Sequence, residues 1–234
     1  MRVRVEFIKG DRARHISHLD LLRTWERAMR RAGLPVAMSQ GFNPHPKMVP
    51  ASSLPVGQTS RAEIMEVVLS EPVSPAEFVR RINAAMPDGL RITRAKEVPA
   101  EAGSPAALVS GAVYEARPWG EARSSPHDEA SEASIAASAV TSAVERFLAA
   151  DEVRISRETE KGRRETDLRP LVHGLRWEDG RLTMALAAGR EGTARPSDLL
   201  TAMGFDPSDW NIERIGLFKV TGPDPTKWIA AWDL

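Results

Sequence analysis

Hydrophobic and polar residues alternate at the start of the chain and then repeat at helical spacing. Residues 2–8 place apolar side chains on one side and charged ones on the other, which predicts a half-buried strand. Ser17, with Asp20 three residues later, forms a capping box, so a helix is expected to begin near His18. Its buried stripe is expected from five apolar residues: Leu19, Leu22, Trp25, Met29 and Ala32.

The elements that follow complete a recognisable order. Gly33 ends the first helix, and short strands are expected at 35–39 and 61–69. Ser74 opens a second capped helix, and residues 90–98 form a strand after it. Strand, helix, strand, strand, helix, strand is the order of the ferredoxin-like split βαβ fold.

The second half repeats this order in outline. We expect a strand at 108–117, a helix at 135–148, a strand at 153–157, a hairpin turn at 178–180, a helix from Pro196 and a strand at 211–220. The chain should therefore be an α+β protein of two ferredoxin-like halves, each an antiparallel sheet with helices packed on one face.

The same pattern predicts the domain boundaries. Residues 1–98 form the N-terminal half and residues 107–220 the C-terminal half. Residues 99–134, rich in Pro, Gly, Ser and acids, are expected to be a linker and a mobile insertion within the start of the second half. Residues 221–234 form a tail, which Trp228 and Trp232 are expected to dock.

Composition excludes several classes of protein. The chain has no cysteine, which excludes disulfides, thiolate zinc sites and a cysteine-ligated iron–sulfur cluster. It contains no long apolar run or signal peptide, so we expect a cytoplasmic protein without a membrane partner. The net charge is zero, but residues 1–50 hold ten Lys or Arg against four Asp or Glu. A basic region of this kind favours a phosphate-bearing partner.

Four arginines form a stripe on the first predicted helix. Arg23, Arg27, Arg30 and Arg31 lie on one side of it. One interpretation is a solvated basic face that Glu26 partly compensates. The other is a phosphate-binding ridge, because guanidinium groups pair bidentately with phosphate oxygens.

The loop after this helix has an unusual composition. Gly41 allows an unusual backbone angle, two prolines stiffen the loop, and Asn43, His45 and Lys47 supply hydrogen-bonding groups. Phe42 could stack on a base, although an anchor buried beneath the loop is the alternative for a lone phenylalanine. The loop is therefore a candidate recognition element.

Histidines provide the candidates for catalysis. His18, Asp20 and His45 are weak catalytic candidates, with His15 nearby, because such groups can carry acid–base chemistry. Asp20 is largely explained as the partner of Ser17 in the helix cap. We predict no metal site and no cofactor, since a carboxylate pair, a Walker loop and a dinucleotide-binding signature are all absent.

The second half carries another basic loop, KGRRETDLR. Lysine beside glycine lets backbone amides approach a phosphate, although an exposed basic hairpin tip is an equal alternative. The residues expected to bind the anion are Arg12, Arg14, His15, Ser17, His18, Arg23, Arg27, Arg30, Arg31, Gly41, Phe42, Asn43, His45, Lys47, Lys161, Arg163, Arg164 and Arg169.

The run RHISHLDLLRTWERAMRRAGLPVAMSQGFNPHPK, followed by LPVG and TSRAEIMEVVL, resembles the radical-SAM-linked proteins, a bacterial family with a domain of unknown function. The resemblance is dense over residues 1–70, and KGRRETDLRP matches best in the second half. His15, Met38 and the Val49-Pro50 pair depart from aromatic or apolar positions of that family, which puts any role of those aromatics in doubt. The resemblance implies an accessory or substrate-recognition protein that acts beside a radical SAM protein encoded nearby.

We therefore expect an RNA-binding accessory protein, for tRNA or rRNA, that acts with a separate radical SAM partner and is not an enzyme on its own. One alternative is an RNA-processing or RNA-modifying enzyme, since tandem ferredoxin-like halves also occur in pseudouridine synthases and CRISPR-RNA endonucleases. A second alternative is a protein-interaction module that docks an acidic partner.

Overall fold

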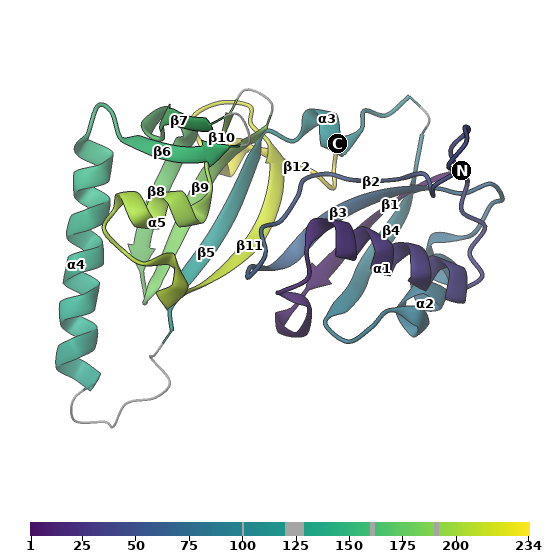
Figure 1. Cartoon of the computed structure of the whole chain (residues 1–234), viewed down its shortest axis with the longest axis horizontal. Helices are drawn as coiled ribbons and strands as arrows, with labels where there is room; N and C mark the ends of the chain where they lie inside the picture. The colour runs from purple at the N-terminus through teal and green to yellow at the C-terminus, as the bar shows by residue number, and fades with distance from the viewer. Residues whose placement is uncertain (100, 120–128, 160–161, 190–191) are drawn as a thin grey trace. The chain divides into compact units, whose positions relative to one another are not determined.

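The protein is a mixed α+β structure in which antiparallel strands predominate (Figure 1). The computed structural model describes residues 1–99, 101–119, 129–159, 162–189 and 192–234, and these residues include five α-helices. They divide into two compact units. The first comprises 1–109, 214–220 and 228–234, and the second comprises 110–213 and 221–227. The units are not consecutive in sequence, because strand β11 (Trp210–Lys219) begins in the second and ends in the first.

Unit 1 contains both helices and three of the four strands predicted for the first half, together with two short elements that the pattern did not predict. They are β1 (Arg2–Lys9), the short 3-10 helix η1 (Asp11–Ala13), α1 (His18–Arg31), β2 (Met48–Pro50), β3 (Thr59–Val68), α2 (Pro75–Ala85) and β4 (Leu90–Val98). A single-turn helix, α3 (Pro105–Leu108), and strand β12 (Ile229–Ala230) complete it. The strand order is β11-β3-β1-β4, β2 pairs with β3, and α1 and α2 lie side by side along the sheet (Figure 1).

The helices of unit 1 cover the face of β1 that carries Val3, Val5 and Phe7, all at most 1% exposed. The ring of Trp25 packs edge-on against Phe7, with 5.1 Å between centroids. The predicted stripe of α1 needs one correction, because Leu19 is 63% exposed and Leu21 is buried. Two residues correspond to about 200° around a helix, so the two leucines cannot both face the sheet.

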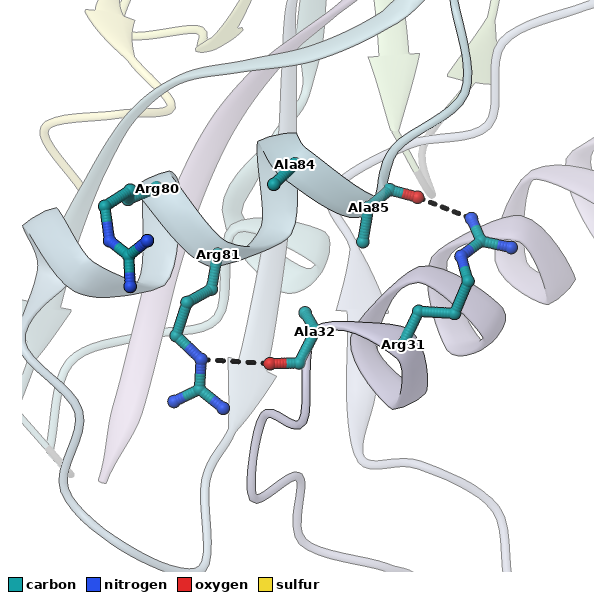
Figure 2. A pocket seen from close by; sticks show the side chains of 6 residues that line it. All are labelled: Arg31, Ala32, Arg80, Arg81, Ala84 and Ala85. Carbon is teal, nitrogen blue, oxygen red and sulfur yellow. Dashed lines mark hydrogen bonds between the residues drawn. The ribbon is translucent and has the colours of Figure 1, made fainter.

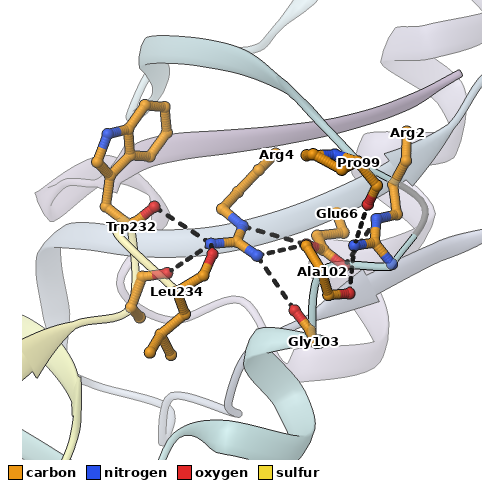
Figure 3. Close-up of polar contacts among 9 residues, drawn as sticks. Arg2, Arg4, Glu66, Pro99, Ala102, Gly103, Trp232 and Leu234 are labelled. Atoms are coloured by element: carbon orange, nitrogen blue, oxygen red, sulfur yellow. Dashed lines mark hydrogen bonds and ion pairs between the residues drawn. The ribbon is translucent and has the colours of Figure 1, made fainter.

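The opposite face of β1 is also covered. We predicted it to be the polar, half-exposed side, yet Arg4 is fully buried. Its guanidinium pairs with Glu66 on β3 at 2.9 Å and donates to the carbonyls of Ala231, Trp232 and Leu234 (Figure 3). The tail therefore lies against this face within unit 1, and its backbone satisfies a charge that would be costly to bury alone.

Unit 2 is built from a second set of strands and helices. They are β5 (Gly111–Pro118), α4 (Glu129–Ala149), β8 (Val172–Glu178), β9 (Arg181–Gly189), β10 (Gly192–Thr193) and α5 (Pro196–Ala202). The strand order is β10-β9-β5-β11, and β8 pairs with β9. The predicted turn between β8 and β9 is present, with φ of 50° at Asp179 and 69° at Gly180. Strands β6 (Arg154–Thr159) and β7 (Gly162–Asp167) form a separate hairpin.

Two further predictions differ from the structure. Residues 35–39 form isolated bridges, Val36 with Leu69 and Met38 with Pro46, and the strand that pairs with β3 is β2. Within the predicted linker and insertion at 99–134, residue 100 and residues 120–128 lie outside the described part of the chain, and helix α4 already begins at Glu129. The residues at 35–39 make only single bridges because the segment that pairs with β3 as a ladder is β2, and tertiary contacts decide that choice.

Candidate nucleic-acid interface

The start of α1 fixes the orientation of the candidate site. Ser17 accepts a hydrogen bond from the backbone amide of Asp20 at 3.2 Å and donates its own hydroxyl to the Asp20 carboxylate at 2.7 Å. The hydrogen bond from Ser17, followed by the approach of Arg23, lowers the pKa of Asp20. The carboxylate is therefore ionised at neutral pH and occupied by the cap, which disfavours a role as a general base.

The cap predicts a pH-dependent contribution to stability. The pKa of Asp20 is lower in the folded protein than its ordinary value of 3.8, so the carboxylate stabilises the fold above that value. The contribution should be lost as the pH falls through the folded-state pKa. Asp20→Asn should therefore unfold more readily than the parent at pH 7, and the difference should vanish once the pH is below the folded-state pKa of Asp20. Urea unfolding at both pH values tests this, and a difference that persists at the low pH would contradict it.

The arginine stripe of α1 is exposed and its charges are weakly engaged. Arg23 lies 3.2 Å from the carboxylate of Asp20, and Arg30 lies 3.4 Å from that of Glu26. Arg27 has no ion-pair partner among the described residues. Ion pairs at the surface contribute little to stability, so an incoming phosphate can replace either carboxylate at small cost.

Arg31 has a structural role instead. It donates to the carbonyl of Ala85 at the end of α2, and Arg81 of α2 donates to the carbonyl of Ala32 at 2.9 Å and to that of Gly33 (Figure 2). Each arginine thereby satisfies the open carbonyl end of the other helix, where a cation also interacts favourably with the helix dipole. The two contacts hold the C-terminal ends of α1 and α2 together.

A shallow pocket of about 320 Å³ lies between these helix ends, lined by Arg31, Ala32, Arg80, Arg81, Ala84 and Ala85 (Figure 2). Arg80 is held by Glu77 through two bonds of 2.8 and 2.6 Å. All three arginines of this pocket already have partners, so it is a weaker candidate for anion binding than the exposed face of α1. We did not predict Arg80 and Arg81, and the adjacent pair on the second helix of the same half was the available signal.

The loop after α1 is a closed hairpin within unit 1. The Ser39 amide donates to the His45 carbonyl at 2.8 Å, and the Lys47 amide donates to the Ala37 carbonyl at 2.8 Å. The Ser39 hydroxyl accepts from the His45 amide at 3.0 Å and lies 3.0 Å from the imidazole Nδ1. The hairpin is fixed to β3 where the Val68 amide donates to the Lys47 carbonyl.

The tip of this hairpin points its side chains outward. Gly41 has a φ of 130°, which an L side chain rarely adopts, and it turns the chain into the tip. Phe42 is fully exposed, so it is not the buried anchor that we considered for the loop. Asn43 and Lys47 are exposed as well. The loop is held together by its own hydrogen bonds and by Pro44, not by apolar burial of its aromatic ring.

The residues just before α1 are divided between surface and interior. Arg12 is exposed and pairs with Asp88, whereas Arg14 is only 9% exposed. Lys9, which we did not single out, is buried beneath this segment and donates to the carbonyls of Arg14 and Ile16 at 3.2 Å. Burial lowers the pKa of Lys9, and Glu63 partly opposes this effect. Lys9 thus fixes the backbone that leads into α1.

The histidines do not assemble into a metal site. His15 is exposed, His18 lies in the first turn of α1, and His45 is engaged within the hairpin. In the described part of the chain, no three His, Cys, Asp or Glu side chains lie close enough together to hold a metal ion.

The basic loop of the second half is a hairpin of unit 2. Arg163 donates to Ser156 across β6 and β7, and Arg164 is exposed. Arg169 donates to the Leu148 carbonyl at the end of α4, at 3.3 Å, which gives it a structural role. Lys161 lies outside the described residues.

A protein-family model matches residues 2–196, a span that includes every candidate residue above. Its description is "Uncharacterized protein conserved in bacteria (DUF2344)". The chain belongs to this family. A comparison of this DUF2344 protein with curated proteins found no match. No helix among the described residues is long and apolar enough to cross a membrane.

Proposed function

We propose that this protein binds RNA, tRNA or rRNA, as an accessory or substrate-recognition protein. The observation that carries the proposal is the exposed arginine face of α1 on the same compact unit as a closed hairpin with an exposed aromatic ring. The guanidinium group of arginine can donate two hydrogen bonds to one phosphate, and phosphate contacts supply most of the affinity for nucleic acid. An aromatic ring and an amide on a stiff loop are groups that RNA-binding proteins use for bases.

The strand order supports a finer description of the fold. In unit 1, β4-β1-β3-β2 is an antiparallel order in which α1 and α2 follow β1 and β3. In unit 2, β11-β5-β9-β8 has the same form, with α4 after β5 and α5 after β9. We infer that both units are variants of the ferredoxin-like split βαβ fold, with the β6–β7 hairpin inserted in the second.

A radical SAM protein is the partner that we propose. The support is the resemblance of the signature through α1 and the hairpin to radical-SAM-linked proteins. Because the chain contains no cysteine, the iron–sulfur cluster of such a pair would have to be held by the partner. This chain would then present the RNA.

Arginine substitution tests the proposed function. The triple variant Arg23→Ala, Arg27→Ala and Arg30→Ala should bind a fluorescently labelled tRNA about 100-fold more weakly at about 0.1 M salt, because three phosphate contacts are lost. The slope of log K against log salt should fall by roughly two to three, and fluorescence anisotropy measures both quantities.

The matched control removes three exposed arginines from unit 2: Arg117→Ala, Arg154→Ala and Arg176→Ala. The control loses the same charge and should retain the parent's affinity within about threefold. Equal weakening by the two triple variants would mean that charge alone is responsible, and no binding by the parent at low salt would exclude the proposal.

A further inference from the structure

Unit 1 also exposes the ring of Phe42, and phosphate binding by the arginines of α1 gives this ring no role. Burial of a phenylalanine side chain stabilises a fold, and the fully exposed Phe42 makes no such contribution. Single exposed apolar residues are common on protein surfaces, so exposure alone decides nothing. What distinguishes Phe42 is the structure beneath it.

The hairpin holds the ring in place before any ligand arrives. Three hydrogen bonds between Ser39 and His45 close the loop across its neck, at 2.8, 3.0 and 3.0 Å. Pro44 and Pro46 restrict the backbone on the same side. A loop that is already ordered loses little conformational entropy on binding, so contacts made by its tip contribute more fully to affinity.

The groups around the ring suit an anion. Residues 27–62 contain no Asp or Glu, whereas they contain five Lys or Arg, and Lys47 stands exposed at the base of the hairpin. The Ser39 hydroxyl lies 3.0 Å from the imidazole Nδ1 of His45, and the Asn43 carbonyl oxygen lies 3.3 Å from the same nitrogen. The imidazole is therefore part of the hydrogen bonding that closes the hairpin, and Lys47 is the group that offers a positive charge to a phosphate oxygen.

An aromatic ring at a loop tip can stack on a base only where the face of the base is uncovered. In an RNA duplex the base faces are covered by neighbouring pairs, and the major groove is too narrow for side chains to read. In single strands, loops and bulges the base can turn out and stack, which is worth about 1–3 kcal/mol per base.

We propose that the hairpin at residues 38–47 holds one unpaired nucleotide of the RNA. The base stacks on Phe42, the Asn43 amide hydrogen-bonds its edge, and the adjacent phosphate lies against Lys47. This inference rests on the proposed RNA-binding function and narrows it to RNA with unpaired bases. A hydrophobic pocket of a partner protein is the other occupant that Phe42 could fit, and the absence of Asp and Glu from residues 27–62 favours the nucleotide.

The test compares two RNA probes and three variants of the full chain. The probes are a labelled single-stranded RNA of mixed sequence and the same RNA annealed to its complement. Phe42→Ala should bind the single strand about 5- to 150-fold more weakly than the parent, which corresponds to the loss of one stacked base. Its affinity for the duplex should remain unchanged. Phe42→Trp should retain single-strand binding, because it keeps the aromatic face.

Val56→Ala is the control, because Val56 is another exposed apolar residue of unit 1, 57% exposed and outside the hairpin. It should match the parent on both probes. Circular dichroism of each variant shows whether the fold is kept. Equal losses for Phe42→Ala on single strand and duplex, or no loss on either, would overturn the inference and leave Phe42 as a protein contact. Weak binding of every RNA by the parent would instead refute the proposed function itself.

Discussion

Replacing Arg214 by alanine is expected to lower the free energy of unfolding by about 3–5 kcal/mol. Arg214 is 1% exposed and holds the buried carboxylate of Glu63 through two bonds of 2.7 and 2.6 Å. It also donates to the carbonyl of Ser53 at 3.0 Å. Without the guanidinium, Glu63 would remain as a buried charge that has lost its bidentate partner, and removal of one partner is far more costly than loss of a surface pair.

Arg80→Ala is the matched control for this prediction. Arg80 holds Glu77 through two bonds of 2.8 and 2.6 Å, nearly the same geometry, but at the surface of α2. Solvent screens that pair, so its loss should change stability little. Urea denaturation of the parent and both variants measures the difference. Similar losses for the two variants would show that burial does not govern the strength of these pairs.

Trp25→Ala is expected to have an effect of similar size, about 3–5 kcal/mol, because it removes the largest fully buried side chain of unit 1. The ring fills the space between α1 and Phe7, and the helix cannot settle into the cavity without moving its capped start. The variant should also weaken RNA binding, since the arginine face of α1 is positioned by this contact.

Two further substitutions show how much of the loss of stability in Trp25→Ala comes from the missing apolar volume and how much from the position on the buried face of α1. Trp25→Phe should be milder, because it keeps most of the apolar volume and removes an indole N–H that is buried without a hydrogen-bond partner in the described part of the chain. Leu19→Ala on the exposed side of the same helix should stay within about 0.5 kcal/mol of the parent. Thermal unfolding ranks the three variants, and a Leu19 variant as unstable as Trp25→Ala would contradict the assignment of the buried face.

Local signals in the sequence predicted much of unit 1. The capping boxes at Ser17 and Ser74 located the starts of both long helices, since the cap depends on side chains three residues apart. Alternation of apolar and charged residues located β1, because side chains two apart lie on the same face of a strand. The strand predicted at 35–39 failed because the residues that pair there are set by contacts with β3 and not by local propensity.

For the candidate site as well, the sequence predicted some features and not others. The arginine stripe could be read from the sequence, because residues three and four apart share a side of a helix. The sequence could not show which arginines remain available for a ligand. Arg31 and Arg81 bind carbonyls of the opposite helix, about fifty positions away in the chain. The exposure of Phe42 was equally beyond the sequence, because a lone phenylalanine fits either a buried anchor or a stacking surface.

The sequence by itself therefore determined α1 and α2, most strands of unit 1, the basic character of α1 and the stiffness of the loop at 41–47. Each of these depends on residues close together in the chain. The tertiary structure alone decided that Arg4 and Arg214 are buried with Glu66 and Glu63, and that Phe42 is exposed. Those outcomes depend on segments far apart in the chain, which remove the arginine charges from solvent and leave the ring of Phe42 uncovered.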